Sequence, residues 1–416
     1  MNIWQEYKNR ISNEMQIDLQ LFADIANKED LNIYLVGGAV RDIIIGRTVA
    51  DADIMVDGDA TVFVKVIIKY TGGKLLIHDS FFTAVLFLPS GRKYDFTSCR
   101  KEYYLYPGAL PITSPGSIQD DLYRRDFTIN AMAMKLSGNN HGDVIDYFNG
   151  LDDIQNKVIR ILHDSSFISD PTRIFRAVRF ESKLGFTINN HTIELAKDAI
   201  SKRIVDKVSG ERIFNEIKQI CNNKFTEQVI KRIKSINLLP SINDNWHTPI
   251  LVNINKIEKL ISENNVISPQ LLRLTWLISS VNSKKDINEI SNRLKISRFI
   301  KKHLISSDEI YNCLAKVNED NSLGGIDVAF KSLSSDTILF LSLMLDNDKR
   351  EVINDYLLII SNFKPLINGD NLIIEGIHPG NEMHCIINKL RYAQLNGLIN
   401  DYSQAIELIH LLKSGT

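Results

Sequence analysis

Two carboxylates one residue apart, Asp51 and Asp53, have the spacing of a metal site. If the run that continues through Val56 is a strand, its two-residue period turns both side chains to one face, where they repel each other. A divalent cation relieves that repulsion, and such oxygen ligands suit magnesium, which keeps its other positions for water and substrate phosphates. The alternative is a solvated strand edge without a metal. The residues just upstream favour the metal site.

A glycine pair, Gly37 and Gly38, stands just before these aspartates. It follows a short apolar run at residues 33–36 and opens an expected helix, so the backbone can approach phosphate oxygens and its amides face an anion. Arg41 adds a charged donor. A lone Gly-Gly turn is common, but strand, turn, helix and aspartates together within residues 31–57 predict a unit that holds a nucleoside triphosphate and a metal ion.

Arg124, Arg125 and Asp126 form a second cluster. Guanidinium groups are planar, permanently charged donors for triphosphate oxygens, and a carboxylate accepts a hydrogen bond from a ribose hydroxyl. The apolar residues that follow are expected to draw this segment into the core, which leaves the two arginines in need of anions. The alternative for Asp126 is that it caps a helix over residues 127–134.

A third group begins with Asp170 and Arg173. They stand three residues apart at the start of an expected helix, so they occupy neighbouring positions on one face, and Arg176 continues that side. The rival interpretation is that Asp170, followed by Pro171, is an N-cap with proline at the first helical position. A capping role would use the same oxygens as a ligand-binding role. We expect Arg176 and Arg179 to contact phosphate or to support the structure.

These residues need a scaffold that changes character near residue 165. Residues 1–30 carry apolar side chains near helical spacing and predict a leading helix. Over residues 31–165 we expect a mixed sheet with helices, built from a helix over 61–70 and strands over 33–36, 74–77, 83–88 and 93–97. Amphipathic helical patterns then predict a helical neck over 166–230 and a helical body and tail over 231–416. The expected fold class is α+β.

Composition narrows the class of protein. The 416 residues exceed one ordinary core, so several subdomains are expected. The cysteines are scattered singly, which suits a reducing compartment, and the chain shows neither an apolar signal core at its start nor an apolar run able to span a bilayer. We therefore expect a cytoplasmic protein that does not enter a membrane.

The charge is unevenly distributed along the chain. The formal net charge is −1, yet residues 157–234 hold 16 Lys and Arg against 9 Asp and Glu. This excess predicts a basic surface where a phosphate backbone would gain by releasing counterions. The alternative is a set of solvated helix faces. The neighbouring nucleotide motifs favour the nucleic-acid surface.

The motifs, in this order, resemble those of class II tRNA nucleotidyltransferases and the related bacterial poly(A) polymerases. GGAVRD at residues 37–42 with DAD at 51–53 is similar to the family's first motif, and RRDFTINAMA at 124–133 to its second. DPTRIFRAVRF at 170–180 is similar to its nucleotide-selecting helix. A weaker similarity lies near the C-terminus. The resemblance thus spans most of the chain, strongly to about residue 185.

This resemblance implies a nucleotidyltransferase head of the DNA polymerase β type, followed by an all-helical neck, body and tail. It implies magnesium at Asp51 and Asp53. It also implies a third carboxylate that helps to bind or activate the attacking hydroxyl, for which Asp95 in the strand over 93–97 is the candidate. The alternative for Asp95 is an edge-strand charge that blunts aggregation.

The resemblance further assigns Asp126 and Asn130 to sugar recognition. It lets Asp170 and Arg173 mimic the Watson–Crick edge of a base, so that the protein acts as its own template. One residue departs from the family pattern: Ser169 stands where the family commonly has glutamate, so whatever positioning that glutamate provides must come from elsewhere.

The implied activity is template-independent addition of A, or of C, C and A, to the 3′ end of tRNA, from ATP and possibly CTP, with release of pyrophosphate. The sequence of residues 98–120 resembles the A-adding branch of the family more than the CCA-adding branch. One alternative is a poly(A) polymerase acting on RNA 3′ ends generally. Another is a non-catalytic RNA-binding scaffold, against which the retained aspartates and arginine pair argue. The body and tail are expected to grip tRNA by shape and phosphates, and the oligomeric state stays open.

Overall fold

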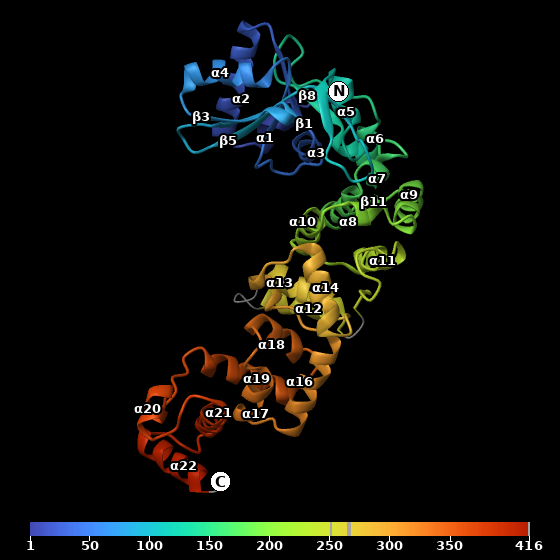
Figure 1. Ribbon diagram of the computed structural model, residues 1–416. Helices are drawn as coiled ribbons and strands as arrows, with labels where there is room; N and C mark the ends of the chain where they lie inside the picture. Colours follow the sequence, from blue (N-terminus) through green and yellow to red (C-terminus); the bar gives the residue numbers. More distant parts are fainter. Residues whose placement is uncertain (250–251, 264–267, 415–416) are drawn as a thin grey trace. The chain divides into compact units, whose positions relative to one another are not determined.

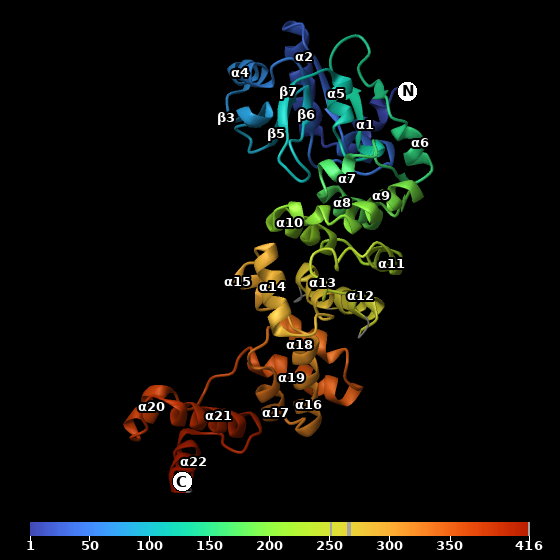
Figure 2. The same ribbon diagram turned by 45° about the vertical axis from the view of Figure 1, so that its right-hand side comes forward.

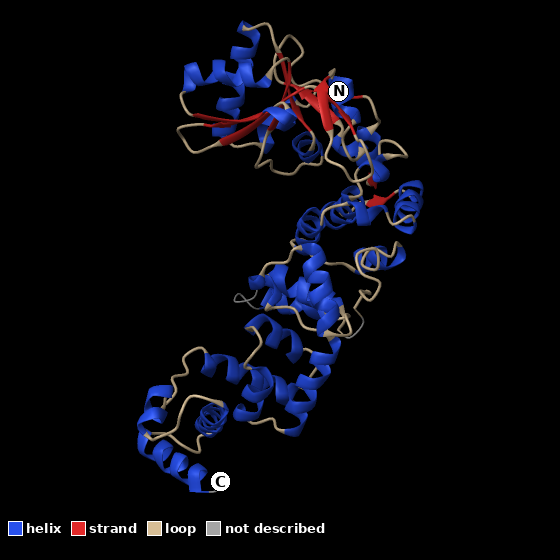
Figure 3. Ribbon diagram, in the orientation of Figure 1, coloured by secondary structure: helices blue, strands red, loops and turns tan. Residues whose placement is uncertain are grey.

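The computed structural model describes residues 1–249, 252–263 and 268–414, and the chain divides into two compact units. The first unit comprises Met1–Glu216 with Ser235–Ser241, and the second comprises Ile217–Lys234 with Ile242–Thr416. Figure 1 and Figure 2 show the elements in two views. All strands of the described residues lie in the first unit, whereas the second is helical (Figure 3).

A seven-stranded sheet forms the centre of the first unit. Its strands lie in the order β3-β4-β5-β2-β1-β8-β9; β2 and β5 are parallel, and the other neighbouring pairs are antiparallel. The bounds are β1 (Asn32–Val36), β2 (Asp53–Asp57), β3 (Lys74–His78), β4 (Thr83–Phe87), β5 (Lys93–Ser98), β8 (Met132–Lys135) and β9 (Val144–Asp146). The four predicted strands are present to within one residue at each end, and the predicted mixed sheet is confirmed.

Alternate residues of the sheet face two different layers. In β2, Ile54 and Val56 belong to the main core, which the sheet shares with helices α2, α3 and α4. Met55 instead packs with Leu122 of helix α5 on the opposite face. The two-residue period of the strand therefore places Asp53 on the α5 face.

The helices of the first unit surround this sheet and continue beyond it. Their bounds are α1 (Trp4–Arg10), α2 (Asn13–Lys28), α3 (Gly38–Ile44), α4 (Ala60–Thr71), α5 (Ile118–Tyr123), α6 (Gly150–Gln155), α7 (Ser166–Ser169), α8 (Thr172–Leu184), α9 (Asn190–Ser201) and α10 (Gly210–Cys221), with short 3-10 turns η1 (Asp79–Phe81), η2 (Thr128–Asn130) and η3 (Ile204–Lys207). Helix α4 matches its prediction to within one residue at each end. Helix α10 continues past the boundary of the first unit.

Three local predictions were wrong. The leading helix over 1–30 is two helices, because the Ser12 hydroxyl caps a new helix by accepting from the Met15 N–H. The helix over 127–134 is instead η2 followed by β8, since β8 pairs with β1. The neck also contains one short strand, β11 (Thr187–Ile188), paired with β10 (Val158–Ile159).

The segment after β5 forms a hairpin that the sequence did not indicate. Strands β6 (Arg100–Tyr103) and β7 (Ile112–Pro115) pair antiparallel as a separate two-stranded sheet. The loop between them docks within the first unit, because the Gly108 N–H donates to the Ser169 carbonyl at 3.3 Å. The hairpin therefore connects the strand that carries Asp95 to the start of the predicted selecting helix.

The second unit is built from helices, as predicted for the body and tail. The bounds are α11 (Glu227–Ser235), α12 (Ile254–Glu263), α13 (Pro269–Ile278), α14 (Lys284–Leu294), α15 (Arg298–Lys301), α16 (Ser307–Glu319), α17 (Leu323–Phe330), α18 (Ser335–Ser342), α19 (Asn347–Ile360), α20 (Gly369–Ile374), α21 (Asn381–Leu395) and α22 (Tyr402–Ser414). Trp246 and Trp276 are fully buried, and each indole N–H donates to a backbone carbonyl. In the described part of the chain, no helix is long and apolar enough to cross a membrane.

Candidate active site

Two carboxylates, Asp53 and Asp95, lie side by side on the α5 face of the sheet, and Asp51 stands just before the first of them. Asp53 opens β2 and lies opposite Asp95 in the parallel β2–β5 pair. Tyr94 and Phe96 belong to the main core, so Asp95 points to the same face as Asp53. Asp51 precedes the strand rather than lying within it. The expectation that the two close aspartates share one strand was therefore wrong, although both are exposed at the same end of β2.

The electrostatics of Asp53 show how close these groups are. Its pKa is raised above the ordinary value, mainly because surrounding protein desolvates the carboxylate. The charge of Arg125 opposes that shift, whereas Asp95 and Asp51 add to it. Lys93 Nζ donates to Asp95 at 2.8 Å. The site therefore concentrates negative charge that the Arg125 guanidinium and the Lys93 ammonium only partly offset.

These carboxylates suit a cation whose remaining coordination positions are filled by the substrate. Among the described residues, no three His, Cys, Asp or Glu side chains form a ready-made metal cage. Magnesium is usually held by one or two carboxylates, with water and substrate phosphates in its remaining positions. Asp51 and Asp53 fit that arrangement, and Asp95 lies beside them.

The turn at Gly37 allows the Arg125 guanidinium to pack closely against the backbone. Gly37 has φ +69°, in the left-handed region, and a Cβ there would come within 2.6 Å of Arg125 Nη1. A side chain at position 37 would therefore displace the guanidinium as well as strain the backbone. Because Arg125 also acts on Asp53, the turn, the carboxylates and the second motif meet at one place.

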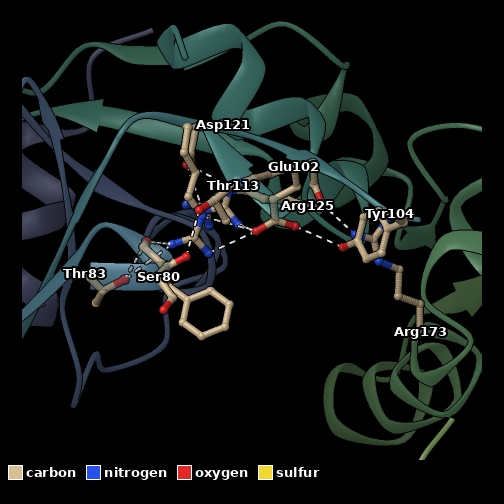
Figure 4. Close-up of polar contacts among 11 residues, drawn as sticks. Ser80, Thr83, Glu102, Tyr104, Thr113, Asp121, Arg125 and Arg173 are labelled. Carbon is tan, nitrogen blue, oxygen red and sulfur yellow. Dashed lines mark hydrogen bonds and ion pairs between the residues drawn. The ribbon is translucent and has the colours of Figure 1, made fainter. Parts of the chain in front are cut away.

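The arginine pair finds anions inside the protein, which the sequence did not indicate. Arg124 donates to Glu102 of β6 and to Asp121 of α5, each at 2.9 Å, and Arg125 donates to Asp121 at 3.1 Å (Figure 4). The Arg125 Nε is buried and finds no hydrogen-bond partner in the part of the chain that the structure describes. Asp121 lies three and four residues before the two arginines on a helical turn, so its spacing was a usable signal. Glu102 also accepts from the Tyr104 hydroxyl at 3.0 Å.

Asp126 and Asn130 are buried at the centre of a polar network. Asp126 Oδ1 accepts from the Asn130 side-chain amide at 2.9 Å, and Oδ2 accepts from Arg176 Nε at 2.8 Å. Burial alone would raise the pKa of Asp126, but Arg176 and Asn130 outweigh it and lower the pKa to about 2. Asn130 in turn accepts from Arg41, which also pairs with Asp42 at 2.8 Å.

Arg41 was expected to donate to phosphate, but it is only 3% exposed and is engaged by these neighbours. Arg176 and Arg179 continue the network into α10. Glu216 lies 3.6 Å from Arg176 Nη1 and 3.4 Å from Arg179 Nε. Within the described ranges, neither Glu216 Oε2 nor Arg179 Nε has a hydrogen-bond partner. Arg41, Arg176 and Arg179 all lie over the Phe180 ring, at 5.0 to 5.7 Å from its centroid.

The proposed selecting residues have other partners in this structure. Asp170 Oδ1 accepts from the Thr172 N–H, the Thr172 hydroxyl and Arg212, so much of the capping interpretation is observed. Helix α8 nevertheless begins at Thr172, one residue later than a cap at Asp170 would place it. Arg173 is buried and donates to the Arg124 carbonyl at 2.6 Å and to the Ser166 hydroxyl.

Fold and site together define the class. A mixed sheet carrying clustered carboxylates opposite an arginine pair is the head of a nucleotidyltransferase, and residues 33–160 match the family model described as the poly A polymerase head domain. The A-adding tRNA nucleotidyltransferase of Geobacter sulfurreducens is 34% identical over 392 residues, 90% of this chain and 44% of that protein. The A-adding tRNA nucleotidyltransferase of Halalkalibacterium halodurans is 30% identical over 409 residues, 94% of this chain and 90% of that protein.

A solved structure extends the likeness over the whole chain. The Thermotoga maritima CCA-adding enzyme complexed with tRNA_CCA superposes with a TM-score of 0.78 at 28% identity, over 99% of each chain. The chain therefore belongs to the family of tRNA nucleotidyltransferases and poly(A) polymerases. It spans less than half the length of the Geobacter sulfurreducens relative.

Proposed function

We propose that this chain is a tRNA nucleotidyltransferase that adds A, or C, C and A, to the 3′ end of tRNA and releases pyrophosphate. The observation that carries the proposal is the pair Asp53 and Asp95 on one sheet face, with Asp51 just before the strand and Arg125 close enough to act on Asp53. Family membership and the names of the similar proteins support tRNA as the acceptor and ATP as a nucleotide substrate. We place this activity in the cytoplasm, with CTP a substrate if the whole CCA end is built.

We propose that Asp51 and Asp53 hold magnesium. When bound, the metal would ease deprotonation of the attacking 3′-hydroxyl and neutralise charge on the phosphates. We propose that Asp95 accepts a hydrogen bond from that hydroxyl, a role that its position next to Asp53 on the same face supports. We propose that Arg125 supplies positive charge toward the triphosphate. The absence of a side chain at Gly37 leaves room for the Arg125 guanidinium.

The remaining residues divide into two roles. Asp126 and Asn130 are held by Arg41 and Arg176, so we propose that the network presents them to the ribose. Arg179 adds positive charge next to Arg176. Before Asp170 and Arg173 can read a base, Arg173 must exchange its bonds to Arg124 and Ser166 for bonds to the nucleotide. We further propose that the neck over 166–230 and the body and tail over 231–416 bind the RNA.

A gel assay at single-nucleotide resolution tests the proposal. Three tRNAs, ending before CCA, after C and after CC, are each offered CTP, ATP or both. Completion of all three defines a CCA-adding enzyme, and addition of one A to the CC end alone defines an A-adding enzyme. A continuing ladder of A would instead indicate a poly(A) polymerase. Binding of tRNA without any extension would indicate a non-catalytic scaffold.

A further inference from the structure

Figure 2 shows where α14 is followed by α15. The turn between these helices carries several exposed cations. Residues 290–307 include five Lys and Arg and no Asp or Glu. Lys295, Arg298 and Lys302 are exposed, and Lys301 is half-buried. In the part of the chain that the structure describes, no carboxylate lies within ion-pair distance of these four side chains. We call Lys295, Arg298, Phe299, Lys301 and Lys302 the basic turn.

Other cations nearby in the second unit are compensated. Lys284 pairs with Glu309, Lys285 with Glu289, and Arg273 with Glu258. Lysine at the end of α14 is accounted for by the helix dipole. That effect does not explain the three further cations at 298, 301 and 302. Uncompensated like charges repel, so their concentration at one turn indicates a binding surface for an anion.

The turn is held rigidly by the residues around it. Lys295 adopts φ +58°, where glycine is usually favoured, and the next residue closes the helix end by donating to the Ser291 carbonyl at 2.9 Å. At the other end, the His303 carbonyl accepts from the hydroxyls of Thr275 and Thr337, at 2.7 and 3.0 Å. The backbone that carries the cations is therefore already ordered, which lowers the entropy lost on binding.

An exposed aromatic ring lies among these cations. Phe299 is 67% exposed, and its ring centroid lies 5.5 Å from that of His303. On the short α15, Arg298 and Lys301 are three residues apart and so lie on neighbouring positions. Cations that contact phosphates, next to a ring that can stack on an unpaired base or pack on a ribose, are what an RNA surface presents to its ligand.

We propose that the basic turn binds the phosphate backbone of the tRNA, as a contact separate from the carboxylate site. The inference rests on the proposed function, because that function supplies the RNA. Each phosphate neutralised by a cation releases counterions, so the contact adds affinity that falls steeply with salt. The turn would thereby hold the RNA without taking part in nucleotide addition.

The test compares tRNA binding over a range of salt for the wild type and for K295S/R298S/K301S/K302S. Two to four lost contacts should reduce the slope of log K against log salt by about 1.5 to 3.5 and weaken binding at least about tenfold at low salt. Apparent KM for tRNA should rise, while kcat at saturating tRNA stays unchanged. The single variant F299S should weaken binding with little change in slope, as loss of stacking predicts.

The matched control is K284S/K285S, which removes two cations of α14 that are paired with carboxylates; its slope should match the wild type within error. Surface changes of this kind should leave the thermal unfolding midpoint nearly unchanged. An unchanged slope in the fourfold variant would overturn the inference. The inference would also be overturned if the fourfold variant lost binding to polyglutamate or to vesicles of anionic lipid but bound tRNA like the wild type. A wild type that extends no RNA would instead refute the proposed function. In that case, a smaller salt slope of tRNA binding in the fourfold variant than in the wild type would still support the contact.

Discussion

Replacing Asp126 by alanine is expected to destabilise the first unit strongly. The side chain is 6% exposed, and its two oxygens accept from the Phe127 N–H, from Asn130 and twice from Arg176. Without it, Glu216 at 3.6 Å is the one carboxylate left within ion-pair distance of Arg176 among the described residues, and the Asn130 amide loses its acceptor. Breaking a buried pair in this way costs about 3 to 5 kcal/mol.

The pH dependence gives an independent estimate for the same residue. Desolvation is the largest influence on Asp126 and raises its pKa, but Arg176 and Asn130 together lower the pKa from 3.8 to about 2. A shift of this size corresponds to roughly 2 kcal/mol. Because the folded pKa is depressed, this stability is fully present above the unfolded value near 4 and is lost as the pH falls toward 2.

Urea unfolding at pH 7 and at successively lower pH measures both quantities. Asp198→Ala is the matched control, because it removes an exposed carboxylate paired with Lys202 on one helix and should cost about 0.5 kcal/mol or less. A double-mutant cycle with Arg176→Met should show coupling of about 1 to 3 kcal/mol. If Asp126→Ala lowered the free energy of unfolding by less than about 1 kcal/mol, a loss close to that of the exposed control, the structural role assigned to Asp126 would be refuted.

Three further changes test other parts of the structure. Gly37→Ala should lower the free energy of unfolding by about 1 to 2 kcal/mol, because the Cβ would strain a residue in the left-handed region. It should also raise the KM for ATP, because the Cβ would displace Arg125. Urea unfolding and initial rates measure these two effects, and an unchanged KM would contradict the proposed role of Arg125. Glu216→Gln should tighten ATP binding several-fold by calorimetry, since it removes the negative charge that lies 3.4 Å from Arg179 Nε. Asp327→Ala should lower the free energy of unfolding of the second unit by roughly 3 kcal/mol, because the buried carboxylate accepts hydrogen bonds from Tyr356 and Arg391. Urea unfolding measures this loss, and a midpoint equal to that of the wild type would show that the network is dispensable.

Local sequence patterns predicted the sheet well where short apolar segments stand between clear turns. The strands over 74–77 and 83–88 are largely continuous apolar runs bounded by glycine or proline turns, whereas apolar and polar residues alternate over 93–97. The segment over 127–134 was mistaken for a helix, because pairing with β1 overrides its local preference. The β6–β7 hairpin was missed, since its two strands pair with each other as a separate sheet and carry few apolar residues that would indicate a strand.

The site was predictable where its residues share a motif and obscure where partners come from distant segments. Asp53 and Arg125 were recognised from neighbouring residues. Glu102 and Glu216, which lie against the arginines from a hairpin and from α10, carry no local signal that distinguishes them from solvated charges. The burial of Arg41 depends on Asn130, 89 residues away. The catalytic and nucleotide-binding roles stay predictions.

The most direct test of the central claim is the rate of A addition to a tRNA ending in CC, measured with magnesium for the wild type, Asp53→Asn and Asp198→Asn. Asp53→Asn is expected to lose at least about a thousandfold in rate while still binding tRNA, because a carboxylate proposed to hold the metal has been neutralised. Asp198→Asn, an exposed carboxylate far along the chain, should retain the wild-type rate. Extension by Asp53→Asn at the wild-type rate would contradict the assignment of the active site to this sheet face.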